Sequence, residues 1–199
     1  MEGAGAPVVV ALVCSTGGLD AVQCILEGLP ATFLGALIVL RHHDPRAVDH
    51  LAPVLRRHTV LPVASARDGD TLLAGRVLVA PTRYHTLVSA GARIALILSG
   101  DRPPYRPSAD LLLTSMALSL GPRAVAVVLS GYGNDGATGA TAVHRFGGTV
   151  IVSNRATSQV FGMPSATIDR YEVVDHVTAV DHIAALLTTV IAARPDRGP

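Results

Sequence analysis

Short, almost wholly apolar runs alternate along this chain with longer stretches in which apolar residues recur at helical spacing. Each run ends in glycine or polar residues, and the runs cover residues 7–14, 36–40, 124–129 and 148–152. The helical stretches cover residues 19–29, 46–58, 109–120, 136–146 and 180–193. Parallel strands that are buried on both faces have such continuous apolar sequences, and strands that alternate with helices form doubly wound sheets. The pattern therefore predicts an α/β fold with a mostly parallel sheet and helices on both of its faces.

A different pattern interrupts this alternation between residues 76 and 98. The pieces RVLVAP, YHTLVSAG and ARIALIL are strand-like, and Ala90-Gly91 is typical of a hairpin turn. Together they predict a small antiparallel hairpin insertion. A length of 199 residues suits a single domain. We expect that domain to cover residues 1–193 and a polar tail to follow at 194–199.

Composition narrows the functional classes. Hydrophobic residues make up 49% of the chain and charged residues 16%, which indicates a globular protein. Lys plus Arg total 16 against 15 Asp plus Glu, so no net basic field favours nucleic acid as a partner. The apolar runs are shorter than the ~20 residues of a membrane-spanning helix. The N-terminus lacks the basic start of a secretory signal, and Cys14 and Cys24 fit reduced thiols. We expect a cytoplasmic protein without membrane insertion.

The residues that follow the predicted strands offer the parts of a catalytic triad. Ligands of open α/β sheets bind outside the carboxyl ends of the strands. The first strand ends at CSTGG, where Ser15 and Thr16 lie on a glycine turn whose backbone N–H groups can face an oxyanion. The second ends at RHHD, which offers a base in His42 or His43, and the strand before SGYGNDG leads to Asp135. A serine becomes nucleophilic when an imidazole takes its proton and a carboxylate orients that imidazole.

Each of these residues also has a simpler interpretation. A Ser-Thr pair before a helix is a common N-cap, so Ser15 and Thr16 can serve the following helix alone. His42 and His43 can each be a solvated histidine at a strand end. Asp135 can simply cap the helix that follows it. The spacing of residues leaves these alternatives open.

Two further motifs raise the question of a bound nucleotide or metal ion. Gly131, Gly133 and Gly136 form the motif G-x-G-x-x-G. A dinucleotide site places that motif in the first β-α unit, with an acidic residue ~20 positions later. Here the motif follows a later strand, and the next strand ends at Ser153, Asn154 and Arg155 instead of an acidic residue. The histidines of HHD, together with His50 and His58, match no strong zinc-binding spacing. We therefore expect neither a metal nor a cofactor.

Five blocks of sequence carry a resemblance to a known family. The chain resembles the catalytic domain of the chemotaxis protein-glutamate methylesterase, the CheB type. The blocks follow in the family's order and are STGG at 15–18, AP-TRYH at 80–85, RPSAD at 106–110, LSGYGNDG at 129–136 and FGMP at 161–164. Five ordered blocks are far more specific than any one of them.

The resemblance implies roles for particular residues. Ser15 matches the nucleophile that carries the acyl group, His42 the base, and Asp135 the carboxylate that orients it. Amides in the turn at Thr16 and Gly17, and near Tyr132, match the oxyanion hole. The resemblance further implies hydrolysis of glutamate γ-methyl esters on chemoreceptor helices and a related deamidation of glutamine. The implied partner is a methyl-accepting chemotaxis receptor or a similar methylated protein.

Several positions depart from the family's pattern. Val13 stands where the family usually has glycine, Arg41 where it has glutamine, and Tyr132 where it has methionine. These changes leave open a catalytically impaired receptor-binding module of the same fold, and the glycine loop leaves open an NADP-binding oxidoreductase. The first strand begins at about residue 7, so we expect a stand-alone domain that lacks the family's receiver domain and its control by phosphorylation.

The implied substrate, a receptor helix rich in acidic residues, would bind best to a site with a positively charged rim. Arg41 adjoins the candidate base, Arg83 lies in the APTRYH block and Arg106 opens RPSAD. We expect these three arginines to contact the substrate, although each can also be a solvated surface side chain.

Overall fold

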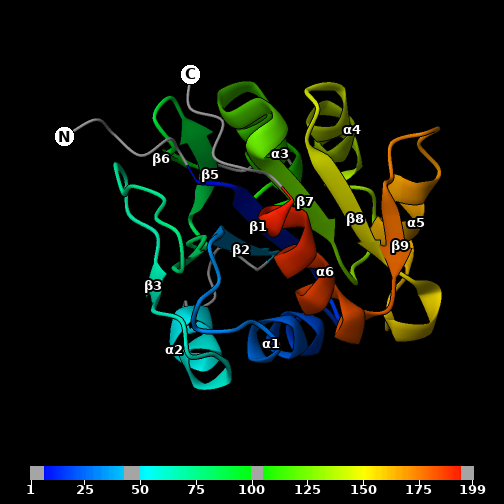
Figure 1. Ribbon diagram of the computed structural model, residues 1–199. Coiled ribbons are helices and arrows are strands. Elements are labelled where there is room, and N and C mark those ends of the chain that lie inside the picture. The colour runs from blue at the N-terminus through cyan, green and yellow to red at the C-terminus, as the bar shows by residue number, and fades with distance from the viewer. Residues whose placement is uncertain (1–6, 43–49, 100–104, 194–199) are drawn as a thin grey trace.

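A seven-stranded parallel sheet forms the centre of the molecule (Figure 1). The computed structural model describes residues 7–42, 50–99 and 105–193. The strand order is β3-β4-β2-β1-β7-β8-β9, and every neighbouring pair is parallel. The strands are β1 (Val9–Cys14), β2 (Ala36–Arg41), β3 (Val63–Ser65), β4 (Val77–Val79), β7 (Ala124–Val128), β8 (Thr149–Ser153) and β9 (His176–Thr178).

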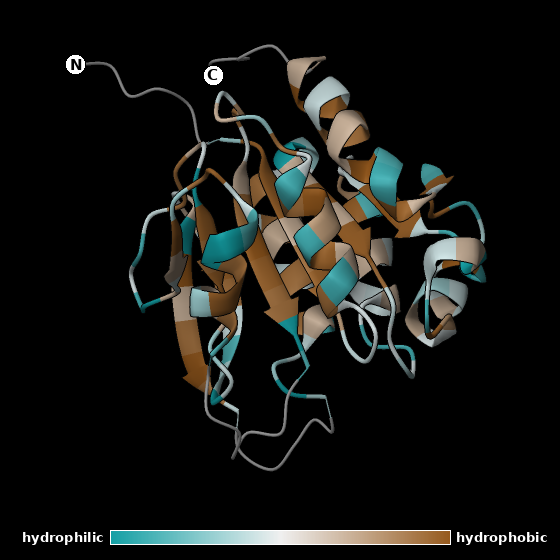
Figure 2. Cartoon of the chain, turned by 90° about the horizontal axis from the view of Figure 1, so that it is seen from below, coloured by the Kyte–Doolittle hydropathy of each residue, from teal (hydrophilic) through white to brown (hydrophobic). Residues whose placement is uncertain are grey.

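Helices cover both faces of this sheet. They are α1 (Leu19–Glu27), α2 (Leu51–Leu55), α3 (Ala109–Leu120), α4 (Ala137–Arg145), α5 (Gly162–Ile168) and α6 (Val180–Ala192). Alternate side chains of β1 point to opposite faces: Val10 and Leu12 pack in one hydrophobic cluster with α1, α2 and α6, and Ala11 and Val13 in another with α3, α4 and α5. Figure 2 shows the resulting band of hydrophobic strands. Each fully buried valine or leucine contributes roughly 1.5–3 kcal/mol to the free energy of unfolding.

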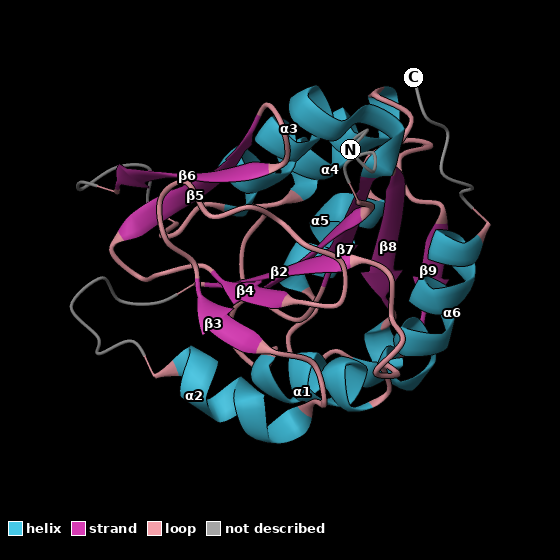
Figure 3. Ribbon diagram, turned by 60° about the vertical axis from the view of Figure 1, so that its left-hand side comes forward, coloured by secondary structure: helices cyan, strands magenta, loops and turns pink. Residues whose placement is uncertain are grey.

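A two-stranded antiparallel hairpin lies outside the main sheet. It consists of β5 (Tyr84–Ser89) and β6 (Arg93–Leu98) and lies beside α3 (Figure 3). Val88 fixes this contact, because its N–H donates to Ser115 Oγ at 2.9 Å and its carbonyl accepts from Ser119 Oγ at 2.8 Å. Val88 and Ile94 enter the hydrophobic cluster beneath.

The expected fold class is confirmed, with one strand in a different place. The RVLVAP piece forms β4, which pairs in parallel with β2 and β3 in the main sheet and is not part of the antiparallel insertion. The helix expected over residues 46–58 is described from Leu51 as α2, followed by a 3₁₀ turn at Arg56–His58. Its first residues, 46–49, lie outside the described ranges. Strands β3 and β9 and helix α5 were not predicted.

The sheet brings the ends of β2, β1 and β7 together. The N–H of Ser15 donates to the carbonyl of Ser130, which lies just beyond β7, at 2.9 Å. The N–H of His42 donates to the carbonyl of Cys14 at 3.0 Å. Hydrogen bonding between strands therefore continues past their ends and fixes the backbone from which the candidate side chains project. Among the described helices, none is long and apolar enough to cross a membrane.

Candidate active site

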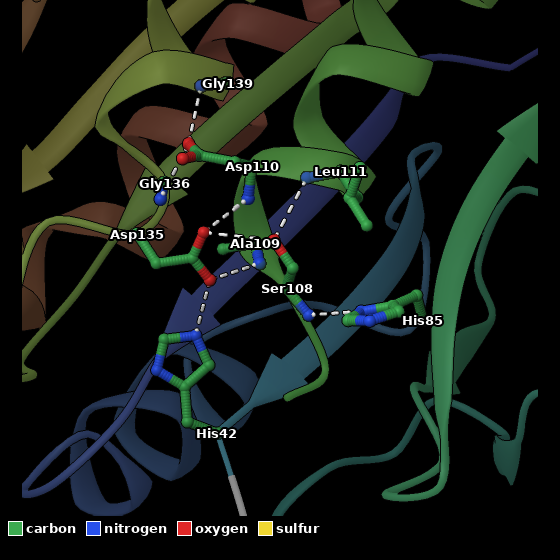
Figure 4. A network of polar contacts seen from close by, with 9 residues as sticks. All are labelled: His42, His85, Ser108, Ala109, Asp110, Leu111, Asp135, Gly136 and Gly139. Carbon is green, nitrogen blue, oxygen red and sulfur yellow. Dashed lines mark hydrogen bonds and ion pairs between the residues drawn. The ribbon is translucent and has the colours of Figure 1, made fainter. Parts of the chain in front are cut away.

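His42 and Asp135 are joined across two strand ends. His42 Nε2 lies 2.8 Å from Asp135 Oδ2 (Figure 4). The side chain of His42 is 10% exposed and that of Asp135 is 3% exposed. An ionised carboxylate only accepts hydrogen bonds, so Nε2 carries the proton and Nδ1 is the basic nitrogen. The pair thus has the imidazole–carboxylate geometry that orients a general base.

The carboxylate of Asp135 accepts three more hydrogen bonds, all from the start of α3. Ser108 Oγ donates to Oδ1 at 3.1 Å, the N–H of Asp110 to Oδ1 at 3.0 Å and the N–H of Ala109 to Oδ2 at 2.6 Å. Burial alone would raise the pKa of Asp135, but the hydrogen bonds from His42 and from these backbone N–H groups outweigh it and hold that pKa below its usual value. Asp135 is therefore ionised at neutral pH.

Asp135 does cap a helix, although a different one from the helix that follows it. It serves the first turn of α3, whose N-cap residue is Ser108. The helix that follows Asp135, α4, is capped by Asp110, whose Oδ1 accepts from the N–H groups of Gly136 at 2.9 Å and Gly139 at 2.7 Å. The two helices therefore exchange caps, which locks Asp135 in place beside His42.

Tyr105 covers the imidazole. Its ring stacks on that of His42, with the ring centroids 5.4 Å apart and the planes inclined by 25°. Gly133, at φ +80°, lies against the hydroxyl end of the tyrosine, and a side chain there would collide with Tyr105 Oη. The glycine loop and the imidazole thus hold the tyrosine between them.

Ser15 does not serve as a helix cap. The N-cap residue of α1 is Gly18, and no side chain caps that end. Gly131 lies directly against Ser15, because a side chain on Gly131 would meet Ser15 Cβ at 2.8 Å and collide with Met163 Sδ. Among the described residues no hydrogen bond joins Ser15 Oγ to His42. Catalytic hydrogen bonds of this kind often tighten only when substrate binds.

Two backbone N–H groups beside Ser15 are available to an anion. Those of Thr16 and Tyr132 donate to none of the described residues. The turn that carries Thr16 is held by a hydrogen bond from Ser130 Oγ to its carbonyl at 2.8 Å. Gly17, at φ +74°, completes the turn and leaves no room for a side chain beside Gln159. The arrangement could hold an oxyanion next to the Ser15 hydroxyl.

The three candidate substrate-binding arginines occupy different environments. Arg83 is exposed in the loop before β5, and its carbonyl accepts from the N–H of Ser99 at 3.1 Å. Arg106 is half-buried and follows Tyr105 directly. Arg41 is also half-buried, with its Nε buried and unbonded among the described residues. The alternation of side chains along a strand directs Arg41 away from His42. Its positive charge instead lies near Cys14: burial raises the pKa of that thiol to about 12, and the charge of Arg41 partly opposes the rise. Arg41 is thus the weakest rim candidate.

Nothing in the described part of the chain gathers metal ligands. No group of three or more His, Cys, Asp or Glu side chains is placed to hold a metal ion there. His58 Nδ1 pairs with Glu27 Oε1 at 2.6 Å, and His50 is exposed before α2. His43 and Asp44 lie outside the described residues. The G-x-G-x-x-G glycines follow β7, and two of them make close contacts with Ser15, Met163 and Tyr105.

Sequence reasoning missed four residues around the pair. They are Tyr105, Ser108, Asp110 and His85; the last is buried, and its Nδ1 accepts the N–H of Ser108 at 3.0 Å. The sequence does carry a signal for Ser108 and Asp110, because a serine followed two residues later by an aspartate is typical of the start of a helix. Nothing in the local sequence indicates the stacking of Tyr105.

Fold and site together define a doubly wound α/β protein with serine, imidazole and carboxylate groups at one edge of the sheet. Residues 10–187 match the family model of the CheB methylesterase, and the chain belongs to this family. It is 35% identical over 189 residues to a protein-glutamate methylesterase/protein-glutamine glutaminase of Koribacter versatilis, and 44% identical over 165 residues to one of Myxococcus xanthus.

These alignments cover 94% and 81% of this chain but 52% and 48% of the two relatives. The chain therefore spans about half the length of the curated relatives it matches. The catalytic domain of the Thermotoga maritima CheB methylesterase superposes with a TM-score of 0.87 at 31% identity. That superposition covers 94% of this chain and 100% of the other.

Proposed function

We propose that this chain is a serine-type carboxylic ester hydrolase that removes methyl groups from glutamate γ-methyl esters of chemoreceptors. The hydrogen bond from His42 Nε2 to the ionised Asp135 carries this proposal, because it leaves Nδ1 as a base of fixed orientation. The family membership and the printed names of the relatives, which are methylesterases and glutaminases, support the reaction class.

The reaction proceeds through an acyl-enzyme on Ser15. Ser15 Oγ attacks the ester carbonyl carbon while its proton passes to His42 Nδ1. The N–H groups of Thr16 and Tyr132 stabilise the oxyanion of the tetrahedral intermediate. The intermediate collapses, the bond to the methoxy group breaks, and methanol leaves with the proton from His42. Water then adds with its proton passing to His42, which returns it to Ser15 as the glutamate carboxylate departs.

Glutamine is a second substrate of the same machinery. Its side-chain amide forms the same acyl-enzyme, and ammonia leaves with the proton from His42 in place of methanol. The names of the relatives pair both activities. We infer that the substrate protein is a methylated receptor segment in the cytoplasm, reached without membrane insertion.

Methanol release from a methylated receptor fragment tests the proposal. The wild-type chain should release methanol, and Ser15→Ala and His42→Ala should each lower turnover by roughly 10³-fold or more. Mass spectrometry of acid-quenched wild type should detect the acyl group on the peptide that contains Ser15. Full activity of Ser15→Ala would exclude the acyl-enzyme. Binding of the fragment without turnover by the wild type would favour the impaired receptor-binding module.

A further inference from the structure

A cavity of about 590 Å³ lies against β3, the edge strand of the sheet, and shares no residue with the candidate active site. Its walls come from the 3₁₀ turn after α2, the loop between β3 and β4, and those two strands. The lining residues include the polar residues Ser65 and Thr71 and the apolar residues Leu72, Leu73 and Leu78. Its volume falls within the ~300–1,000 Å³ range of small-molecule sites.

Three arginines from separate segments line this cavity. Arg56 begins the 3₁₀ turn after α2, Arg67 follows β3, and Arg76 directly precedes β4. Arg56 Nη2 donates to the carbonyl of Val63 at 3.2 Å, which holds its guanidinium beside the edge strand. In the described part of the chain, none of the three forms an ion pair. No carboxylate of the described residues therefore pairs directly with these three guanidinium groups.

The lining of the cavity also includes one acidic residue. Asp70 lies in the cavity wall, and its Oδ2 accepts the N–H of Arg67 at 2.8 Å, which closes the turn after β3. Three arginines less one aspartate leave a charge of +2 around the cavity, against +1 for the whole chain. The excess charge is thus local, and it favours an anion that carries more than one negative charge.

Guanidinium groups match phosphate oxygens because their planar N–H fork binds two oxygens at once. Arginines spread around a cavity suit a ligand whose negative charge is also spread. Leu73, which is 45% exposed, offers apolar contact to an organic part of the ligand. We propose that this cavity binds a small diphosphate-bearing molecule, with Arg56, Arg67 and Arg76 on the phosphate oxygens.

Calorimetric titration of the full chain with inorganic pyrophosphate at constant ionic strength tests the proposal. Wild type should bind one equivalent saturably, and Arg67→Ala and Arg76→Ala should each raise Kd by roughly 10-fold. Arg145→Ala is the matched control, because Arg145 is exposed at the end of α4, away from the cavity lining. Absence of saturable binding, or equal losses in the Arg145 variant, would overturn the proposal. No hydrolytic activity is measured, so the result is independent of the proposed function.

A reciprocal variant separates binding from folding defects. Asp70→Asn removes the negative charge but keeps an oxygen that can accept the N–H of Arg67, so pyrophosphate should bind roughly 3-fold to 10-fold more tightly. A gain in affinity does not arise from a damaged fold. Unchanged or weaker binding by Asp70→Asn would overturn the electrostatic basis. Binding of a hexaglutamate peptide without binding of pyrophosphate would also overturn the proposal, in favour of a surface that docks acidic protein segments.

Discussion

Asp135 serves two parts of the molecule with one carboxylate. Its Oδ2 accepts from both His42 and the N–H of Ala109, and its Oδ1 accepts from Ser108 and from the N–H of Asp110. In each of these four hydrogen bonds the carboxylate oxygen is the acceptor. The residue that bonds to the imidazole therefore also completes the first turn of α3, so we expect the proposed function and the stability of the fold to be coupled at this position.

Asp135→Asn should damage both properties. Whichever oxygen becomes an amide NH₂ will face N–H donors, so we expect a loss of about 1–3 kcal/mol in the free energy of unfolding. The orientation of His42 is lost as well, and turnover should fall by roughly 10³-fold or more. Denaturant unfolding and methanol release measure the two effects. Asp175→Asn is the matched control, because Asp175 Oδ2 accepts the N–H of Val150 away from the site; it should lose some stability and keep its turnover.

The stability gap between wild type and Asp135→Asn should depend on pH in a defined direction. The pKa of Asp135 is lower in the folded chain than in the unfolded one. Its ionisation therefore stabilises the fold above an unfolded pKa of about 3.9, and this contribution disappears as the pH falls through the folded pKa. The gap should be steady from about pH 7 to pH 5 and narrow below about pH 4. A gap that widens in acid would contradict the ionised role of Asp135.

Tyr105 should matter through its ring and not through its hydroxyl. The ring packs on one face of His42 and so restricts the imidazole. In the proposed reaction it would also place π electrons beside the positive charge of a protonated His42. Tyr105→Ala should therefore lower kcat roughly 10-fold, with a smaller change in KM, and Tyr105→Phe should retain most activity. Steady-state kinetics on the receptor fragment would show the split. Equal losses in both variants would indicate that the hydroxyl, not the stack, is what the site uses.

At the scale of elements, α3 and α4 hold the site by exchanging caps. Asp110→Ala removes the acceptor for the N–H groups of Gly136 and Gly139, and we expect a loss of about 0.5–2 kcal/mol in the free energy of unfolding. Asp20→Ala is the control: Asp20 lies in the first turn of α1, is exposed and makes no side-chain hydrogen bond to the described residues. Urea denaturation should show a clear difference between the two. Equal losses would mean that the caps contribute little.

The helices and strands that the sequence predicts are those long enough to show a clear apolar pattern within their own residues. β1 and β7 are buried on both faces and so give continuous apolar runs, and α3 begins and ends where its apolar spacing predicts. β3 and β9 have three residues each, too few to establish a period. β4 was assigned to the wrong sheet because a three-residue apolar strand does not indicate which neighbours it pairs with.

The residues of the candidate site also fall into two groups, those that the sequence predicts and those that depend on tertiary packing. The rule that ligands bind at carboxyl ends of parallel strands points to Ser15, to a histidine of RHHD and to Asp135, and the family resemblance then selects His42. The stacking of Tyr105 and the reach of Asp110 to α4 depend on how α3 packs against the sheet and α4. That packing is tertiary, so no local pattern carries it.

At the scale of the whole molecule, the candidate site lies at the carboxyl ends of neighbouring strands in the middle of the sheet. β1 lies between β2 and β7, and its six residues are all buried. The backbones that carry Ser15 and His42 are therefore held by hydrogen bonds to the strands beside them. The charge at these strand ends depends on individual side chains, because the chain as a whole is close to neutral at +1.

Arg83 and Arg106 remain the better candidates for contacts to an acidic receptor segment. Arg83 is exposed in the loop after β4, which ends at the same sheet edge, and Arg106 adjoins the tyrosine that covers His42. If they face the substrate, Arg83→Ala and Arg106→Ala should each slow association with a receptor fragment by roughly 3-fold to 10-fold at low salt and flatten its salt dependence. Hydrolysis of a small neutral ester should stay nearly unchanged, because that substrate carries no charge for the rim to attract.

Stopped-flow association at several salt concentrations and a chromogenic ester assay measure the two quantities. Arg145→Ala, at the far end of α4, controls for the loss of one positive charge from the molecule and should affect neither. A loss on both substrates would place the arginine in the catalytic apparatus, since a neutral ester responds only to the chemistry at Ser15. A loss on neither would assign the arginine to the solvated surface, where a single charge contributes little to binding.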